Sequence, residues 1–185
     1  MEQWTAIEQL LIGLAEHDLR AEGEVRPTLF AGRGEELLLI AGVRPFPKHG
    51  YQDPLIELLA LACPLGADRL AVSIGGRAWS LNDPLPPVVD GVGDLRQRVL
   101  CLDLAVAGEP QRSVVRPYEM AGDEVCWGDM IEQMDTDGWI GSALRIAVTQ
   151  GLGVVPQSEL RRQARRCARL GHALTFSPEA AERIA

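Results

Sequence analysis

The sequence is poor in lysine and in aromatic residues. A single lysine, Lys48, stands among 18 basic residues, and phenylalanine, tryptophan and tyrosine together make up 5% of the chain. We attribute the lopsided ratio of arginine to lysine to a GC-rich genome, so the arginine count alone does not indicate a function. The four tryptophans are spread singly, which is not the spacing of a base-stacking platform.

Several motifs that would identify an enzyme are missing. The chain has no phosphate-binding Gly-x-x-x-x-Gly-Lys-Ser/Thr loop, no Gly-x-Gly-x-x-Gly dinucleotide fingerprint and no Gly-x-Ser-x-Gly elbow. The histidines at positions 17, 49 and 172 are too scattered for a His-x-His or His-Glu-x-x-His metal centre. We therefore expect no cofactor and no bound metal.

Long apolar runs and export signals are also missing. No run approaches the roughly 18 residues that span a bilayer. The first residues lack the basic region and apolar core of a signal peptide. These features predict a cytoplasmic protein that makes no contact with a membrane.

The cysteines fit a reducing compartment. None of the four belongs to a Cys-x-x-Cys pair, so we expect reduced thiols in the core (Cys63, Cys101, Cys126 and Cys167). Cys167 lies among arginines and is the one thiol whose pKa we expect to be lowered.

Length and charge set further bounds. A chain of 185 residues fits one ordinary domain that needs neither disulfides nor a structural metal to fold. The formal net charge of −8 disfavours non-specific binding of the whole molecule to nucleic acid.

The hydrophobic pattern alternates between helical and strand periods. Apolar residues at helical spacing predict a first helix over 3–17, and an almost wholly apolar stretch over 55–62 predicts a buried helix that begins at Asp53-Pro54. Strand patterns occupy 27–32, 36–46, 69–80, 97–107, 113–118 and 124–127, and helices follow at 139–149, 158–170 and 177 to the end.

This order predicts an α+β fold. We expect a largely antiparallel sheet of about five strands with a buried helix, an N-terminal helix and C-terminal helices. Residues 1–130 would form the sheet core, and 131–185 a helical extension packed on the same domain. The order of elements resembles that of profilin-like folds of the roadblock and longin type, as an analogy of topology alone.

The first candidate site is the loop over residues 44–53. It holds Arg44, Lys48, His49 and Tyr51 between a central strand and the buried helix. Cationic side chains near a helix N-terminus suit an anionic ligand, and His49 could act as an acid or base near neutral pH. The alternative is a rigid, proline-bracketed loop in which Asp53 caps the helix and Lys48 is solvated.

The second candidate is acidic, with carboxylates at 129, 132, 135 and 137. If Gly138 takes the sixth position of a calcium loop, Gln133 falls first and Leu144 twelfth, where carboxylates are required. The chain therefore has no EF-hand, although a magnesium site remains an alternative. The simpler interpretation is a polar turn in which Asp135 or Asp137 caps the helix near Trp139.

The third candidate is the basic helix over 158–170. Five arginines occupy adjoining faces and apolar residues line the opposite face; the arginines are Arg161, Arg162, Arg165, Arg166 and Arg169. Such a face could bind phosphates or an acidic partner. The alternative is that these arginines pair with the chain's own carboxylates.

The sequence leaves three possible functions. We favour a non-catalytic interaction or regulatory module that binds a protein partner or itself. A small enzyme or binder acting on an anionic ligand through the 44–53 loop is the first alternative. Nucleic-acid binding through the 158–170 helix is the second and the less favoured.

Overall fold

The fold is built on one antiparallel sheet. The computed structural model describes residues 2–47, 50–78, 84, 96–136, 138–150 and 155–185. Its strands run in the order β6-β5-β4-β3-β1-β2-β8, and β7 pairs with β5. The strands are β1 (Thr28–Arg33), β2 (Glu36–Gly42), β3 (Arg69–Ala78), β4 (Gln97–Val106), β5 (Arg112–Ala121), β6 (Glu124–Trp127), β7 (Ile131–Met134) and β8 (Ala173–Phe176).

The predicted α+β class is confirmed, but the sheet has eight strands rather than about five. The strands that the pattern missed, β7 and β8, are four residues long. Alternation over so few residues is too short to distinguish a strand from a turn. Both lie within residues 131–185, where we had expected helices, whereas the division of the chain near residue 130 stays a prediction.

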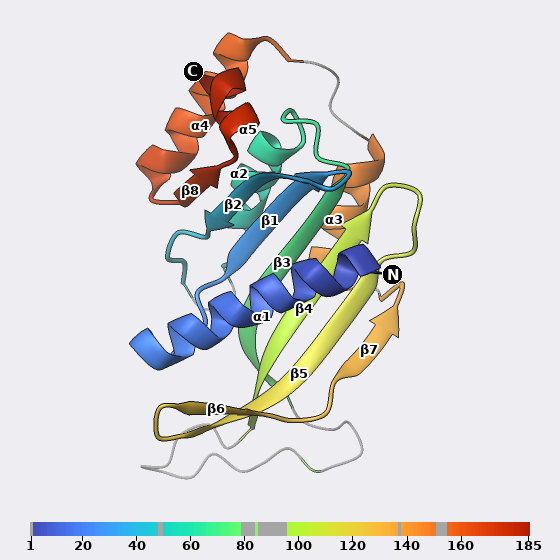
Figure 1. Ribbon diagram of the computed structural model, residues 1–185, viewed down its shortest axis with the longest axis vertical. Coiled ribbons are helices and arrows are strands. Elements are labelled where there is room, and N and C mark those ends of the chain that lie inside the picture. The colour runs from blue at the N-terminus through green and yellow to red at the C-terminus, as the bar shows by residue number, and fades with distance from the viewer. Residues whose placement is uncertain (1, 48–49, 79–83, 85–95, 137, 151–154) are drawn as a thin grey trace.

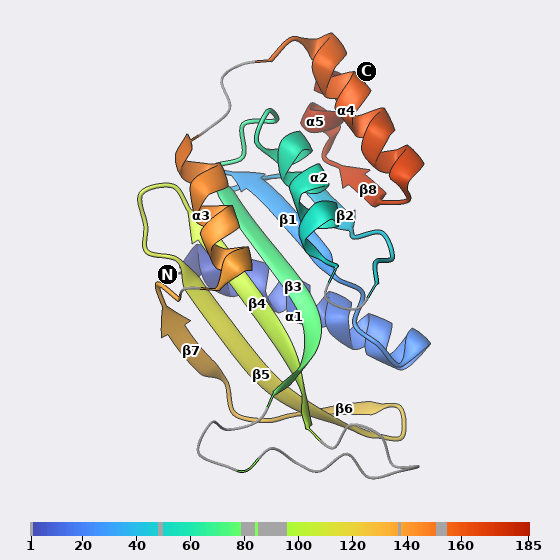
Figure 2. The same ribbon diagram turned by 180° about the vertical axis from the view of Figure 1, so that it is seen from behind.

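Helices cover the sheet on both faces. Figure 1 shows α1 (Glu2–Glu22) crossing one face, and Figure 2 shows α2 (Gln52–Ala62) and α3 (Trp139–Gln150) on the other. The remaining helices, α4 (Gln157–Leu170) and α5 (Pro178–Ile184), flank β8 at one end of the sheet. None of the described helices is long and apolar enough to cross a membrane.

The two layers of helices enclose two cores. On one face, a stripe of α1 formed by Ile7, Leu11, Ala15 and Leu19 packs on the sheet together with Phe30. On the other face, the apolar side chains of α2 meet those of α3, α4 and α5 over β1, β2 and β3. Helix α2 is buried between these elements, as its nearly continuous apolar sequence predicted.

The predicted start of one helix is confirmed, and the predicted start of another is wrong. Helix α5 begins as predicted, because the Ser177 hydroxyl accepts a hydrogen bond from the Ala180 N–H at 3.2 Å. Helix α2 begins earlier than predicted, after Tyr51 and without a side-chain cap. Asp53 therefore lies inside the first turn instead of capping it.

Candidate functional site

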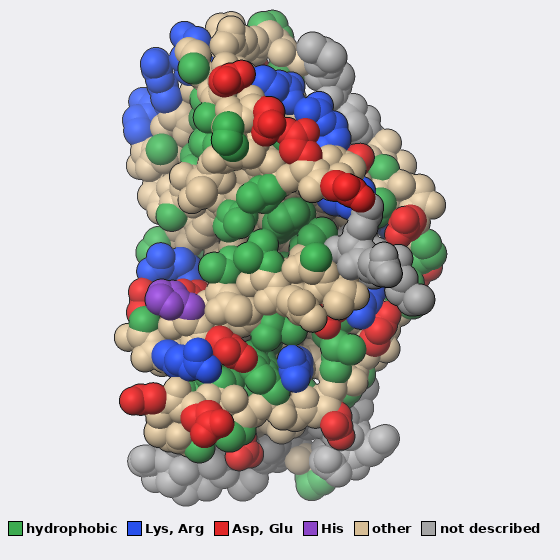
Figure 3. All heavy atoms as spheres, viewed as in Figure 1, with side chains coloured by type: hydrophobic (Ala, Val, Ile, Leu, Met, Phe, Trp, Pro, Cys, Tyr) green, Lys and Arg blue, Asp and Glu red, His purple; other side chains and the backbone are tan. Residues whose placement is uncertain are grey.

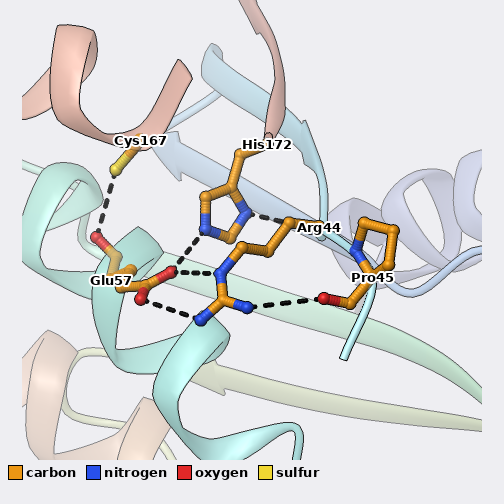
Figure 4. Close-up of polar contacts among 5 residues, drawn as sticks. All are labelled: Arg44, Pro45, Glu57, Cys167 and His172. Carbon is orange, nitrogen blue, oxygen red and sulfur yellow. Dashed lines mark hydrogen bonds and ion pairs between the residues drawn. The ribbon is translucent and has the colours of Figure 1, made fainter. Parts of the chain in front are cut away.

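The two described candidates of the 44–53 loop, Arg44 and Tyr51, do not converge on one point. Lys48 and His49 lie outside the described residues. Tyr51 packs edge-on against Trp139 of α3, with 5.8 Å between the ring centroids. Arg44 instead turns to Glu57 of α2 (Figure 4). The two described candidates of this loop thus have different partners.

Glu57 joins Arg44 to His172 in a compact polar cluster. Arg44 donates from Nε to Oε2 at 2.8 Å and from Nη2 to Oε1 at 3.0 Å, a two-point contact with the carboxylate (Figure 4). The same Oε2 lies 2.8 Å from Nε2 of His172. The cluster therefore links the segment after β2, helix α2 and the residue that precedes β8.

The backbone fixes the tautomer of His172. The Arg44 N–H points at Nδ1 of the ring at 3.2 Å, and an N–H can only donate. Nδ1 therefore accepts, and Nε2 carries the proton that is donated to Glu57. The side chain of His172 is fully buried, which suits a structural role better than a reactive one.

The charges of Arg44 and Glu57 compensate each other within this cluster. The hydrogen bonds from Arg44 lower the pKa of Glu57 from 4.5 to about 2, and burial opposes them only in part. The hydrogen bond to Glu57 in turn raises the pKa of Arg44. An open hollow of about 550 Å³ beside Arg44 is also lined by Glu22, Glu24 and Arg26, so that its charges balance. Arg44 thus offers little free positive charge to an anion.

Cys167 is a buried thiol rather than an activated one. Its sulfur donates to the backbone oxygen of Glu57 at 3.4 Å, and the residue is 1% exposed. Burial raises the pKa of this thiol, and the nearby Glu57 raises it further. The prediction of a lowered pKa for Cys167 is therefore wrong, because the sulfur faces the core whereas the neighbouring arginines face solvent.

The acidic candidate is dispersed. Glu132 binds Arg112, with 2.7 Å between Oε1 and Nε. Asp135 does not cap α3, because its carboxylate accepts the N–H of Gln111 at 3.2 Å. Asp137 lies outside the described residues. Among the residues described, no three His, Cys, Asp or Glu side chains gather as a metal site would require.

Helix α4 has two contrasting faces. Leu160, Ala164 and Cys167 are buried and pack toward α2 and α5. The opposite side carries all five arginines, of which four are exposed and Arg161 is half-buried. Figure 3 shows blue side chains gathered at the upper left, where α4 lies in Figure 1.

Two of the five arginines have partners within the chain. Arg161 donates from Nε to the backbone oxygen of Ile184 at 3.0 Å, which ties α4 to α5. Arg162 pairs with Glu159 one turn earlier on the same helix.

The other three are unpaired. Within the described part of the chain, Arg165, Arg166 and Arg169 make no hydrogen bond and no ion pair. The alternative that the arginines of this helix neutralise the chain's own carboxylates therefore holds for Arg162 and fails for these three.

The arginines enclose an open groove along the helix. Ser158 and Ala168 line it together with Arg161, Arg162, Arg165 and Arg169, around about 700 Å³ of space. The eight steps from Arg161 to Arg169 correspond to about 12 Å of helix. We name these residues, together with Arg166 beside the groove, the arginine face.

Charge in this protein is strongly segregated. Helix α4 has five arginines and one glutamate, a net charge of +4, in a chain whose net charge is −8. The rest of the molecule therefore carries −12, and the arginine face is a cationic surface on an anionic body. Such a surface steers and orients an anionic partner.

The chain was compared with protein-family models, with curated proteins and with solved structures, and it matches none of them.

Proposed function

We propose that this protein is a non-catalytic interaction module that binds an acidic segment of a protein partner on its arginine face. The observation that carries the proposal is the unpaired state of Arg165, Arg166 and Arg169 in a chain with 26 acidic residues. Three exposed guanidinium groups on adjoining turns present donors that suit carboxylates.

The charge distribution favours a short acidic segment over nucleic acid. The cationic surface is about 12 Å long. A duplex or a long single strand would extend past it onto a body with a charge of −12, where phosphates are repelled. A peptide segment of a few carboxylates ends before that repulsion begins.

The 44–53 loop is less suited to be the binding site. Arg44 is engaged by Glu57, and the hollow beside it contains two carboxylates. An anionic ligand there would have to compete with groups already in place.

The expected contribution of the arginine face follows from ordinary ion-pair energies. Each exposed pair with a carboxylate is worth about 0 to 1 kcal/mol, so three pairs give at most about 3 kcal/mol. A tenfold change in affinity corresponds to about 1.4 kcal/mol, and loss of all three would weaken binding by up to about 100-fold.

The test uses two probes, a labelled peptide of about four glutamates, whose extended length of about 13 Å matches the arginine face, and a labelled oligothymidylate of about twelve nucleotides, which extends past it. Binding is measured by fluorescence anisotropy at about 50 and about 200 mM salt. The wild type is compared with a variant that combines Arg165→Gln, Arg166→Gln and Arg169→Gln. A control variant removes the same charge elsewhere, through Arg20→Gln, Arg26→Gln and Arg145→Gln.

We expect the peptide to bind the wild type more tightly at the lower salt concentration than at the higher one. It should lose most of its affinity for the α4 variant and keep nearly all of it for the control variant. Equal weakening in both variants would show that only the overall charge matters. Tight binding of the oligothymidylate without binding of the peptide would replace this proposal with the nucleic-acid alternative. Binding of neither probe would refute it.

A further inference from the structure

Strand β7 and the residue before it carry an unusual concentration of exposed apolar side chains. Met130 is 45% exposed, Ile131 54% and Met134 53%, and all four residues of the strand are exposed. These three belong to a set of seven large hydrophobic residues exposed in the described chain, and they fall within five consecutive positions. Figure 2 shows β7 at the margin of the sheet.

The outer edge of β7 has free backbone groups. Among the described strands, β7 pairs with β5 alone, in a register that sets Gln133 opposite Ser113 and Met134 opposite Arg112. The same register continues to Asp135, whose N–H donates to the backbone oxygen of Gln111 at 2.8 Å.

Backbone direction alternates along an antiparallel strand, so residues 131, 133 and 135 turn their N–H and C=O groups toward β5. Residues 130, 132 and 134 turn theirs outward. The outward set is therefore Met130, Glu132 and Met134, and two of these three are exposed methionines.

The devices that usually protect an edge strand are weak here. Edge strands avoid pairing through free charges, proline or bulges. Strand β7 contains no proline, and its register against β5 is continuous.

Its one charge is paired rather than free. Glu132 is bound at both oxygens by Arg112, at 2.7 and 3.1 Å, and Arg112 also holds Glu8 of α1 at 2.8 Å. The short length of the strand is the main protection left.

We propose that β7 is a self-association edge, which pairs antiparallel with β7 of a second copy of this chain about a two-fold axis at Glu132. An axis perpendicular to the sheet keeps each helix layer on its own side and places residues of the same face opposite one another. Met130 of one copy then lies opposite Met134 of the other, on both sides of the axis.

The edge is complementary to itself in chemistry as well as in register. The outward residues are apolar, paired acid and apolar in both directions, so a second copy meets the same sequence of properties. The central pair brings together two glutamates that each arrive with an Arg112 partner, which reduces the repulsion of like charges across the strands, although each Arg112 also serves Glu8.

The association is expected to be weak. Stable dimers bury about 800 Å² on each partner, which is more than five paired residues provide. We take a dissociation constant of about 10 to 100 μM as the expected range for so small a contact. The contact does not involve the arginine face, so its success or failure leaves the function proposed above untouched.

Two changes at the edge test the proposal. Met134→Pro removes an N–H that points outward and is not used in the β5 ladder, and Met130→Lys places a charge in the interface. The control is Ile146→Lys, which changes an equally exposed apolar residue on α3. Sedimentation equilibrium of the full chain is run over a concentration series at low and high salt, with thermal unfolding of each variant.

We expect the wild type and Ile146→Lys to approach the dimer mass with similar dissociation constants, and salt to tighten the association modestly because it screens the repulsion between two chains of net charge −8. Both edge variants should weaken association at least tenfold, while Met130→Lys keeps the wild-type unfolding temperature. A wild type that stays monomeric up to about 1 mM would overturn the proposal. So would a dimer that survives both edge changes, or growth beyond two copies, since a two-fold contact is closed.

Discussion

Replacing Glu57 with glutamine removes the negative charge at the centre of the polar cluster that ties β2 to α2 and β8. The carboxylate accepts two bonds from Arg44 and one from His172, and its side chain is 17% exposed. Glu57→Gln keeps the shape but leaves Arg44 without a counter-charge. We expect the variant to be less stable than the wild type at pH 7.

The magnitude follows from the pKa of Glu57, which the folded protein lowers from 4.5 to about 2. A difference of one pKa unit corresponds to about 1.4 kcal/mol, which gives about 3 kcal/mol as an upper value. Arg44 is 22% exposed, so water screens part of this interaction. We therefore expect Glu57→Gln to lower the free energy of unfolding by about 2 kcal/mol at pH 7.

The direction in which the stabilisation by Glu57 changes with pH follows from its lowered pKa. A group whose folded pKa is lowered stabilises the protein above its unfolded pKa and loses that contribution as the pH falls through its folded pKa. The stabilisation from Glu57 is thus complete above about pH 5 and fades between pH 4.5 and about 2. The difference between wild type and variant should fade with it.

The assay is urea unfolding of both proteins between about pH 2.5 and 7, with Glu182→Gln as the control for loss of an exposed carboxylate. The control should change stability by less than about 0.5 kcal/mol. A Glu57→Gln variant as stable as the wild type at pH 7, or a difference that does not shrink in acid, would refute the reasoning.

Two further predictions concern the interior. Gly141→Ala would drive a methyl group into the side-chain amide of Gln111, which is fully buried and bonded to Asp103, Ser113 and Thr136. We expect urea unfolding to show a loss of about 2 kcal/mol in the free energy of unfolding. An unchanged urea midpoint would contradict this view of the packing. When a thiol reagent is added to the native protein near pH 8, only the exposed Cys126 should react quickly. Burial raises the pKa of Cys101 to about 11 and also raises the pKa of Cys63 and Cys167. A second fast-reacting thiol would contradict this prediction.

The sequence predicted the parts of the fold that depend on long periodic stretches. The apolar run of α2 and the alternation in β3 and β4 were long enough to identify buried elements. The four-residue strands β7 and β8 were not, since their place is set by pairing with β5 and β2 rather than by their own pattern.

The candidate site was predictable only in part. The amphipathic pattern of α4 placed its arginines on one side, as found. Which of them lack partners depends on the position of Glu159 and of the α5 backbone, which only the folded chain shows. Glu57 and His172 could not be paired in advance either, because 115 positions separate them and neither belongs to a motif.

The most direct test of the central claim observes the arginine side chains themselves. In nuclear magnetic resonance spectra, the Nε–H signals of Arg165, Arg166 and Arg169 are followed while the glutamate peptide is added. The account predicts that these three shift together and saturably, while the signals of Arg20 on α1 and of Arg26 in the segment after α1 stay in place. Shifts spread over all exposed arginines, or none on α4, would contradict it.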